Sequence, residues 1–172
     1  NKIPKLKVLE IQIPYESDII VESKSMKLYL NEFYKKSFKI EKELIIKIKK
    51  DIESVIKNPI NVKLINSFCN EPAFKLLNNT KQKFTTPNTL YKFNGFRSIC
   101  PVTSQPDFAN IYIFSDKTIE VDWLNKYLIS FKEHGGFHEK CIDEIYLKLE
   151  KKVNSNHLEI CGRFQRRGGI DI

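Results

Sequence analysis

Hydrophobic and polar positions along this chain follow two spacings, one typical of β-strands and one typical of α-helices. Residues 5–13 alternate and residues 60–65 are rich in apolar side chains, which predicts a strand in each. Between them, apolar residues recur every three or four positions in residues 26–34 and again in residues 44–56. This spacing predicts two helices. Ser23 or Ser25 can cap the first, and Asn58-Pro59 stops the second.

The second half of the chain has a similar order of elements. Residues 66–88 are rich in Asn, Thr, Lys and Pro with little periodicity, which predicts a long connection. We expect Gly135-Gly136 to break the following helical pattern in two. The predicted elements of this half are strands at 89–97, 108–114 and 158–164, helices at 119–131 and 141–149, a turn at 166–169 and the start of a strand at 170–172.

These elements form nearly the same unit twice. Tyr29-Leu30-x-x-Phe33 and Tyr127-Leu128-x-x-Phe131 share a pattern at the matching point of each unit. Helices adjacent in sequence beside antiparallel strands favour the α+β class over a parallel sheet. The first unit lacks the strand that opens the second, so we expect it to be incomplete.

Composition narrows the class of protein. The 172 residues suffice for one ordinary domain or two very small ones. The net charge of +8 suits an anionic partner, nucleic acid or a phosphate-bearing ligand, although lysines on solvated helix faces also account for it. No apolar run approaches the roughly 20 residues of a membrane span, and no signal peptide is visible. The first residue is Asn1 rather than Met, so we expect the chain to be cut at its start. The four cysteines show no CxxC spacing and no zinc pattern with the histidines, so we expect reduced thiols, no metal and a cytoplasmic protein.

One proline-bracketed segment pairs a potential nucleophile with a carboxyl group. Cys100 precedes Asp107 by seven positions, and Pro101 and Pro106 restrict the backbone between them. A deprotonated thiol is a strong nucleophile, and a nearby carboxyl can supply or take a proton. A lone cysteine is also often a small buried apolar group, so both interpretations stay open here.

Three further segments carry candidate chemistry. Residues 22–27 (ESKSMK) open a helix whose unpaired N–H groups, serines and lysines suit a phosphate, or they are an ordinary capped helix start. His138-Glu139 follows Gly135-Gly136, where it could bind a heterocycle or be surface. Residues 163–169 (RFQRRGG) form a dense cationic patch that suits phosphates or the tip of a basic hairpin.

Taken together, these four segments resemble the NADPH-dependent 7-cyano-7-deazaguanine reductases, the nitrile reductases of queuosine biosynthesis. Residues 22–29 look like the signature motif of that family, with Met26 where another apolar residue is usual, and residues 100–107 look like its nucleophile segment. Residues 131–139 and 163–171 also match. The signature precedes the nucleophile, as in the long, two-module form of the family.

The resemblance implies a tunnelling fold with tandem modules, each an antiparallel sheet with two helices. Residues 1–66 would be the remainder of the first module, 67–88 the connection, and 89–172 the second module with the nucleophile. The family also implies a homo-oligomer, expected to be a dimer, with the active site where modules meet. Relatives extend further at both ends, so the first module is expected to be incomplete.

The resemblance also assigns roles to residues. Cys100 would add to the nitrile to give a thioimide, and Asp107 would transfer protons with help from His138. Glu22, Glu139 and His138 would bind the 7-deazaguanine substrate. The residues expected to bind NADPH are Ser23, Lys24, Ser25 and Lys27, with Arg166 and Arg167 as weaker candidates.

Two other functions are compatible with the residues. A cysteine-dependent nitrile or amide hydrolase would share the thioimide but let water attack it, and no dedicated base for that water is evident. A non-catalytic tRNA-binding module would account for the charge and would be indifferent to replacement of Cys100. Direct tRNA binding is not expected once the four motifs are taken together.

Overall fold

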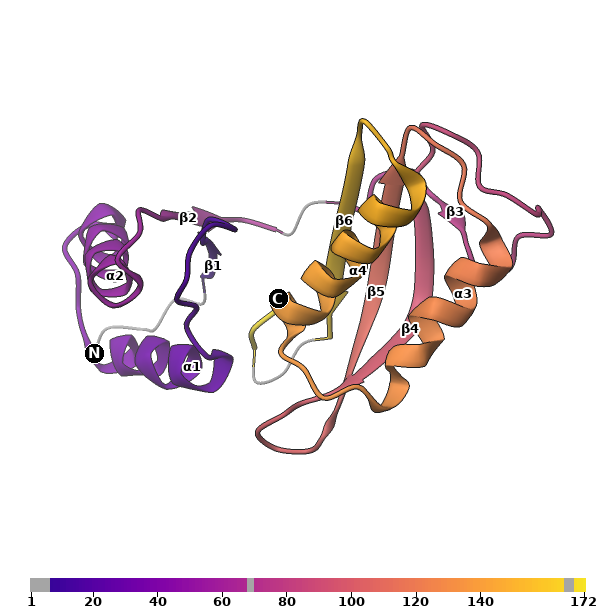
Figure 1. The fold of residues 1–172 in the computed structure, drawn as a ribbon. Coiled ribbons are helices and arrows are strands. Elements are labelled where there is room, and N and C mark those ends of the chain that lie inside the picture. Colours follow the sequence, from indigo (N-terminus) through magenta and orange to yellow (C-terminus); the bar gives the residue numbers. More distant parts are fainter. Residues whose placement is uncertain (1–6, 68–69, 166–168) are drawn as a thin grey trace. The chain divides into compact units, whose positions relative to one another are not determined.

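The computed structural model describes residues 7–67, 70–165 and 169–172. The chain divides into two compact units, Asn1–Glu71 and Pro72–Ile172, which are described separately (Figure 1). No helix among these residues is both long enough and apolar enough to cross a bilayer.

The N-terminal unit is a two-stranded antiparallel sheet with two helices. β1 (Val8–Gln12) pairs with β2 (Asn61–Ile65). Between them lie α1 (Ser23–Asn31), the short 3₁₀ helix η1 (Glu32–Lys35) and α2 (Glu41–Ile56). Every fourth residue at the end of α2 is buried, so this face of the helix is its packed side: Ile48, Ile52 and Ile56.

The C-terminal unit is a four-stranded sheet in the order β3-β4-β5-β6 (Figure 1). β4 (Tyr91–Ile99), β5 (Pro106–Ser115) and β6 (Leu158–Phe164) are antiparallel neighbours. α3 (Val121–Ile129), the 3₁₀ helix η2 (Ser130–Glu133) and α4 (His138–Val153) connect β5 to β6 and cover one face. The core between the layers includes these fully buried side chains: Leu77, Phe96, Ile111, Leu124, Leu128, Ile145 and Leu149.

Two predictions for this half of the chain are wrong in detail. The connection at 66–88 contains a two-residue strand, β3 (Lys75–Leu76), which runs parallel to β4 and makes the sheet mixed. No strand forms at 170–172, where the described backbone offers only isolated contacts, including a hydrogen bond from the Phe164 N–H to the Ile172 carbonyl. The α+β class is confirmed.

The two units share the dimensions of their helical segments. α1, η1 and α2 have 9, 4 and 16 residues, and α3, η2 and α4 have the same three lengths. The repeated Tyr-Leu-x-x-Phe pattern falls at the same point of each. Its aromatic rings meet edge to face in both, at 5.1 Å for Tyr29 and Phe33 and 5.4 Å for Tyr127 and Phe131.

A β-bulge in β4 changes which side chains face the helices. Phe93 pairs with Ile111 and Phe96 with Ala109, so β4 has one residue more than β5 between these pairs. Gly95 lies in the bulge at φ +79, a conformation that side chains with a Cβ rarely adopt. The extra residue lets Phe93 and Phe96 both point into the core although they are three positions apart.

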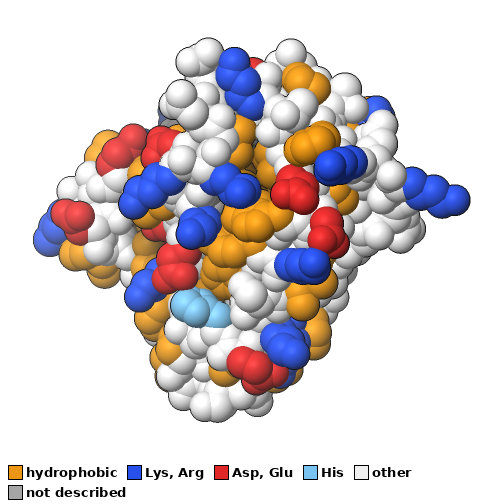
Figure 2. Space-filling model, turned by 45° about the vertical axis from the view of Figure 1, so that its right-hand side comes forward, with side chains coloured by type: hydrophobic (Ala, Val, Ile, Leu, Met, Phe, Trp, Pro, Cys, Tyr) orange, Lys and Arg blue, Asp and Glu red, His pale blue; other side chains and the backbone are white. Residues whose placement is uncertain are grey.

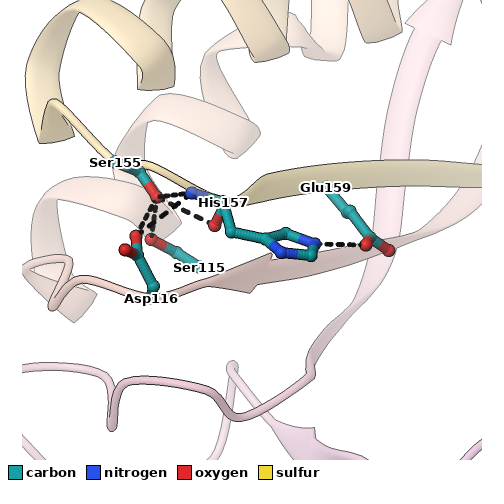
Figure 3. Close-up of polar contacts among 5 residues, drawn as sticks. All are labelled: Ser115, Asp116, Ser155, His157 and Glu159. Atoms are coloured by element: carbon teal, nitrogen blue, oxygen red, sulfur yellow. Dashed lines mark hydrogen bonds and ion pairs between the residues drawn. The ribbon is translucent and has the colours of Figure 1, made fainter.

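The Asp116 carboxylate links the segment that follows β5 to the segment that precedes β6 (Figure 3). It accepts hydrogen bonds from the Ser155 hydroxyl and from the N–H groups of Asn156 and His157. The hydrogen bond from Ser155 is the largest of the effects that hold the pKa of Asp116 below its ordinary value. The ionised carboxylate therefore stabilises this end of the sheet.

Charged side chains of both signs are dispersed over the face drawn in Figure 2. Lys and Arg lie interspersed with Asp and Glu rather than gathered in one patch. The net charge of +8 therefore does not take the form of a single basic stripe on this face.

We predict that Gly95→Ala destabilises the C-terminal unit by about 1–2 kcal/mol because of its left-handed backbone. An added Cβ meets no atom within 4 Å, so steric crowding does not contribute. Gly135→Ala is the matched control, since Gly135 also has open space around it but no positive φ. Urea unfolding followed by the fluorescence of Trp123, the one tryptophan of the chain, measures both. Equal midpoints for the two variants would contradict the prediction.

We predict that Asp116→Asn lowers the urea midpoint at pH 7 and that this difference from the parent shrinks as the pH falls below about 3.9. A depressed carboxyl pKa contributes stability above the unfolded-state pKa of about 3.9, and this contribution is lost as the pH falls through the folded-state value. Asp122→Asn, which removes an exposed carboxylate paired with Lys126, is the control. A difference from the parent that is the same at pH 7 and at pH 2.5 would rule out this linkage.

Candidate active site

The Cys100 segment is the closed loop of a β-hairpin. β4 and β5 stay paired up to Ile99 and Pro106, and residues 100–105 connect them. The Cys100 N–H donates to the Gln105 carbonyl at 2.9 Å, and the Ser104 N–H donates to the Cys100 carbonyl at 2.9 Å. These two bonds hold the half-buried Cys100 at the base of the loop.

The loop stabilises the thiolate form of Cys100. Burial raises the pKa of the thiol, but hydrogen bonds from the Thr103 hydroxyl and from the N–H groups of Thr103 and Val102 outweigh it and leave the pKa below its ordinary value. The negative charge of Asp107 acts against this lowering, so it lies within electrostatic range of the thiol. A lowered pKa increases the fraction of nucleophilic thiolate at neutral pH.

Asp107 and His138 form an acid–base pair beside this loop. Asp107 is the second residue of β5, and its side chain is 7% exposed. Nε2 of His138, the first residue of α4, lies 3.2 Å from Oδ2 of Asp107. The imidazole stacks on the ring of Phe164 with centroids 4.1 Å apart, which fixes its plane. The structure therefore brings together the three residues predicted to be catalytic at one end of the sheet.

Backbone hydrogen bonds attach the start of α4 to the end of β4. The Ile99 N–H donates to the His134 carbonyl at 2.8 Å, and the Gly136 N–H donates to the Ile99 carbonyl at 3.1 Å. A Cβ on Gly136 would lie 3.2 Å from Sγ of Cys141, so the absence of a side chain permits this close approach. Glu139 follows in the first turn of α4, where its side chain is exposed.

In the N-terminal unit, the predicted signature motif starts α1 with a different cap from the one expected. Glu22, and neither serine, is the N-cap: its carboxylate accepts 2.8 Å hydrogen bonds from the N–H groups of Lys24 and Ser25. The expectation that these N–H groups are unpaired is wrong, because an internal carboxylate already fills the place of an anion. The side chains of Lys24 and Lys27 are exposed and Ser23 is half-buried.

Two predicted site residues lie outside the described part of the chain, and two residues of the site were not predicted from the sequence. Arg166 and Arg167 lie outside the described residues. Thr103 and Phe164 were not predicted, although a hydroxyl three positions after the thiol was a visible signal for Thr103. Within residues 7–67, 70–165 and 169–172, no group of three or more His, Cys, Asp and Glu side chains is arranged to hold a metal ion.

We predict that Thr103→Val slows alkylation of Cys100 by iodoacetamide several-fold at pH 7. The variant loses the hydroxyl that lowers the thiol pKa, so less thiolate is present to react. Thr103→Ser, which keeps the hydroxyl, should react like the parent. Peptide mapping by mass spectrometry follows Cys100, with the fully buried Cys141 as the slow internal reference. Unchanged labelling of Cys100 in Thr103→Val would refute its role.

Comparison with known proteins places the chain among named relatives. Residues 106–172 match the family model described as QueF-like protein, and residues 1–64 match the one described as nitrile reductase, 7-cyano-7-deazaguanine-reductase N-term. The chain is similar to three proteins named NADPH-dependent 7-cyano-7-deazaguanine reductase. That of Buchnera aphidicola subsp. Schizaphis graminum is 32% identical over 198 residues, which are all of this chain and 74% of the relative.

The other two relatives give the same result. The protein of Hahella chejuensis is 31% identical, with 98% of this chain and 70% of the relative covered. That of Colwellia psychrerythraea is also 31% identical, with 98% and 69% covered. The resemblance read from the sequence motifs is confirmed: the chain belongs to the family of NADPH-dependent 7-cyano-7-deazaguanine reductases.

Proposed function

We propose that this chain reduces the nitrile of 7-cyano-7-deazaguanine to the aminomethyl group, in queuosine biosynthesis, with Cys100 as the covalent nucleophile. The observation that carries the proposal is a thiol with a lowered pKa within electrostatic range of the Asp107 carboxyl, which is paired with His138. The names of the three relatives supply the substrate and the NADPH dependence of this proposal.

In the first step, the Cys100 thiolate adds to the nitrile carbon. One π bond of the nitrile breaks, and the nitrogen takes a proton from Asp107, which gives a thioimide. A protonated Asp107 also favours the thiolate, because it removes the negative charge that raises the thiol pKa. His138 can return a proton to Asp107 through the Nε2–Oδ2 contact of 3.2 Å.

Two reductions complete the reaction. NADPH supplies one hydride for each of them when bound. At the carbon held by Cys100, the first reduction would release the sulfur as thiolate and leave an imine, and the second, with a proton, would give the amine. The protein holds the nitrile carbon of the substrate beside Cys100. Asp107 supplies a proton to the substrate nitrogen when the thioimide forms and again when the amine forms.

Substrate recognition is assigned to carboxylates. A carboxylate accepts charge-assisted hydrogen bonds from the amidine-like N–H edge of a guanine. Glu139 is exposed in the first turn of α4, one residue after His138, and could turn to such an edge near Cys100. Glu22 is the second candidate, since its carboxylate is held in place by the start of α1.

Part of the start of α1 suits the phosphates of NADPH. The exposed ammonium groups of Lys24 and Lys27 lie three residues apart on one face of α1 and suit phosphates. The N–H groups of Lys24 and Ser25 do not fit, because the Glu22 carboxylate accepts from them. Ser23 and the Ser25 hydroxyl remain candidates beside the two lysines, as do Arg166 and Arg167 from the sequence.

We further propose that the two units are tandem modules of the tunnelling fold and that the protein assembles as a dimer. The equal lengths of the helical segments and the matched Tyr–Phe ring pairs support a common module. In this proposal residues 1–66 are the first module, 67–88 the connection and 89–172 the second.

The test uses the full chain and two variants. We predict that the parent oxidises NADPH, followed at 340 nm, only when the nitrile is added, and that Cys100→Ala abolishes this. Asp107→Asn should slow turnover by about 10²- to 10⁴-fold while it still binds substrate. Mass spectrometry of parent and nitrile without NADPH should detect one covalent adduct, absent in Cys100→Ala.

Each outcome is decisive. A parent that releases ammonia from the nitrile without oxidising NADPH would be a hydrolase, and the proposed reduction would be wrong. Nitrile-dependent oxidation at the parental rate in Cys100→Ala would remove the thiol from the chemistry. Normal turnover in Asp107→Asn would remove the acid.

A further inference from the structure

We propose that Ser98 is a positioning residue that holds the Asp107 carboxyl as it gains and loses its proton. This inference rests on the proposed function, because it concerns the acid of that reaction. It is carried by the strand register, by the burial of the Ser98 hydroxyl and by the hydrogen-bonding capacity of that group.

The register places Ser98 directly opposite Asp107. The two residues are paired across β4 and β5. Side chains of directly opposed residues in an antiparallel pair lie on the same side of the sheet, with Cβ atoms about 4.5–5.5 Å apart. A serine oxygen one bond beyond Cβ and a carboxylate oxygen two bonds beyond can therefore meet at hydrogen-bond distance.

The bulge at Gly95 decides that Ser98 faces this way. With the extra residue, Phe96 and Ser98 form one inward row, and both are 0% exposed. Without it, Gly95 and Arg97 would occupy that row. Gly95, at φ +79, therefore allows the bulge that places the Ser98 hydroxyl on the same side of the sheet as Asp107.

The buried hydroxyl of Ser98 lacks a hydrogen-bond partner among the described residues. The Cys141 thiol is near enough for Ser98 to offset in part the rise in thiol pKa caused by burial, but the two groups do not reach hydrogen-bond geometry. Sulfur is a weak partner, and buried hydroxyls are normally paired, so a rotation about χ1 toward Asp107 would satisfy the group.

A hydroxyl suits this place better than a charged group. It donates to the carboxylate and accepts from the carboxylic acid, so it can stay bonded in both states of Asp107. It carries no charge and does not compete for the proton. The other titratable groups that act on this region are Cys100 from the loop, and His138, Glu139, Cys141 and Glu144 from α4.

The test is Ser98→Ala in the full chain, with NADPH oxidation resolved into kcat and KM as the readout. We expect kcat to fall about 10- to 100-fold with KM and the urea midpoint unchanged, because only the placement of the acid is lost. Ser115→Ala removes a buried hydroxyl at the opposite end of β5 and should leave both kcat and KM unchanged.

A double-mutant cycle and a volume-conserving variant complete the experiment. In the Asp107→Asn background, Ser98→Ala should have little further effect if it acts through the carboxyl. Ser98→Cys keeps the shape of the side chain and should also be slow, which separates the role from a folding defect. Parental kcat in both Ser98 variants would overturn the inference, as would full additivity in the cycle. Absence of turnover in the parent would instead overturn the proposed function.

Discussion

The β-bulge at Gly95 is the constraint on which the rest of the C-terminal unit depends. A single extra residue in β4 brings Phe93 and Phe96 onto the same side, so the core below α3 and α4 is filled from both halves of the strand. The same shift sends Ser98 inward beside Asp107. Past it, Ile99 exchanges two backbone hydrogen bonds with the segment before α4 and so fixes His138 opposite the hairpin loop. Packing and chemistry are therefore set by one backbone irregularity.

The electrostatics of the site depend on the hydrogen-bond donors and the Asp107 carboxylate that act on the Cys100 thiol. The Thr103 hydroxyl and two loop N–H groups favour a negative sulfur, while a negative Asp107 opposes it. The combination of thiolate and protonated carboxyl relieves that opposition, and it is the combination needed to add sulfur to carbon and a proton to nitrogen in one step. The Nε2 atom of His138, held by the ring of Phe164, can exchange the proton with that carboxyl.

Much of this could be predicted from the sequence, and the rest depends on tertiary geometry. Apolar spacing located both helix pairs and the main strands. The motif around Cys100 indicated Asp107 as its partner, and the family resemblance added His138. The bulge was invisible because its cause is a register shift between β4 and β5, and Gly95 alone does not reveal its φ. β3 was missed because two residues carry no periodicity. The cap of α1 was assigned to a serine because short hydroxyls are the common caps.

The capping of α1 by Glu22 affects how this residue can bind a substrate. The hydrogen bond from the Lys24 N–H is the largest of the effects that lower the pKa of this carboxyl, so the cap keeps Glu22 ionised. A carboxylate has about four acceptor positions, and two N–H groups and the Ser25 hydroxyl leave room for another donor. Capping and recognition of a guanine-like edge are thus compatible in one side chain. The cap removes the free helix N-terminus as a phosphate site, and in exchange it presents a fixed anion to a hydrogen-bond donor.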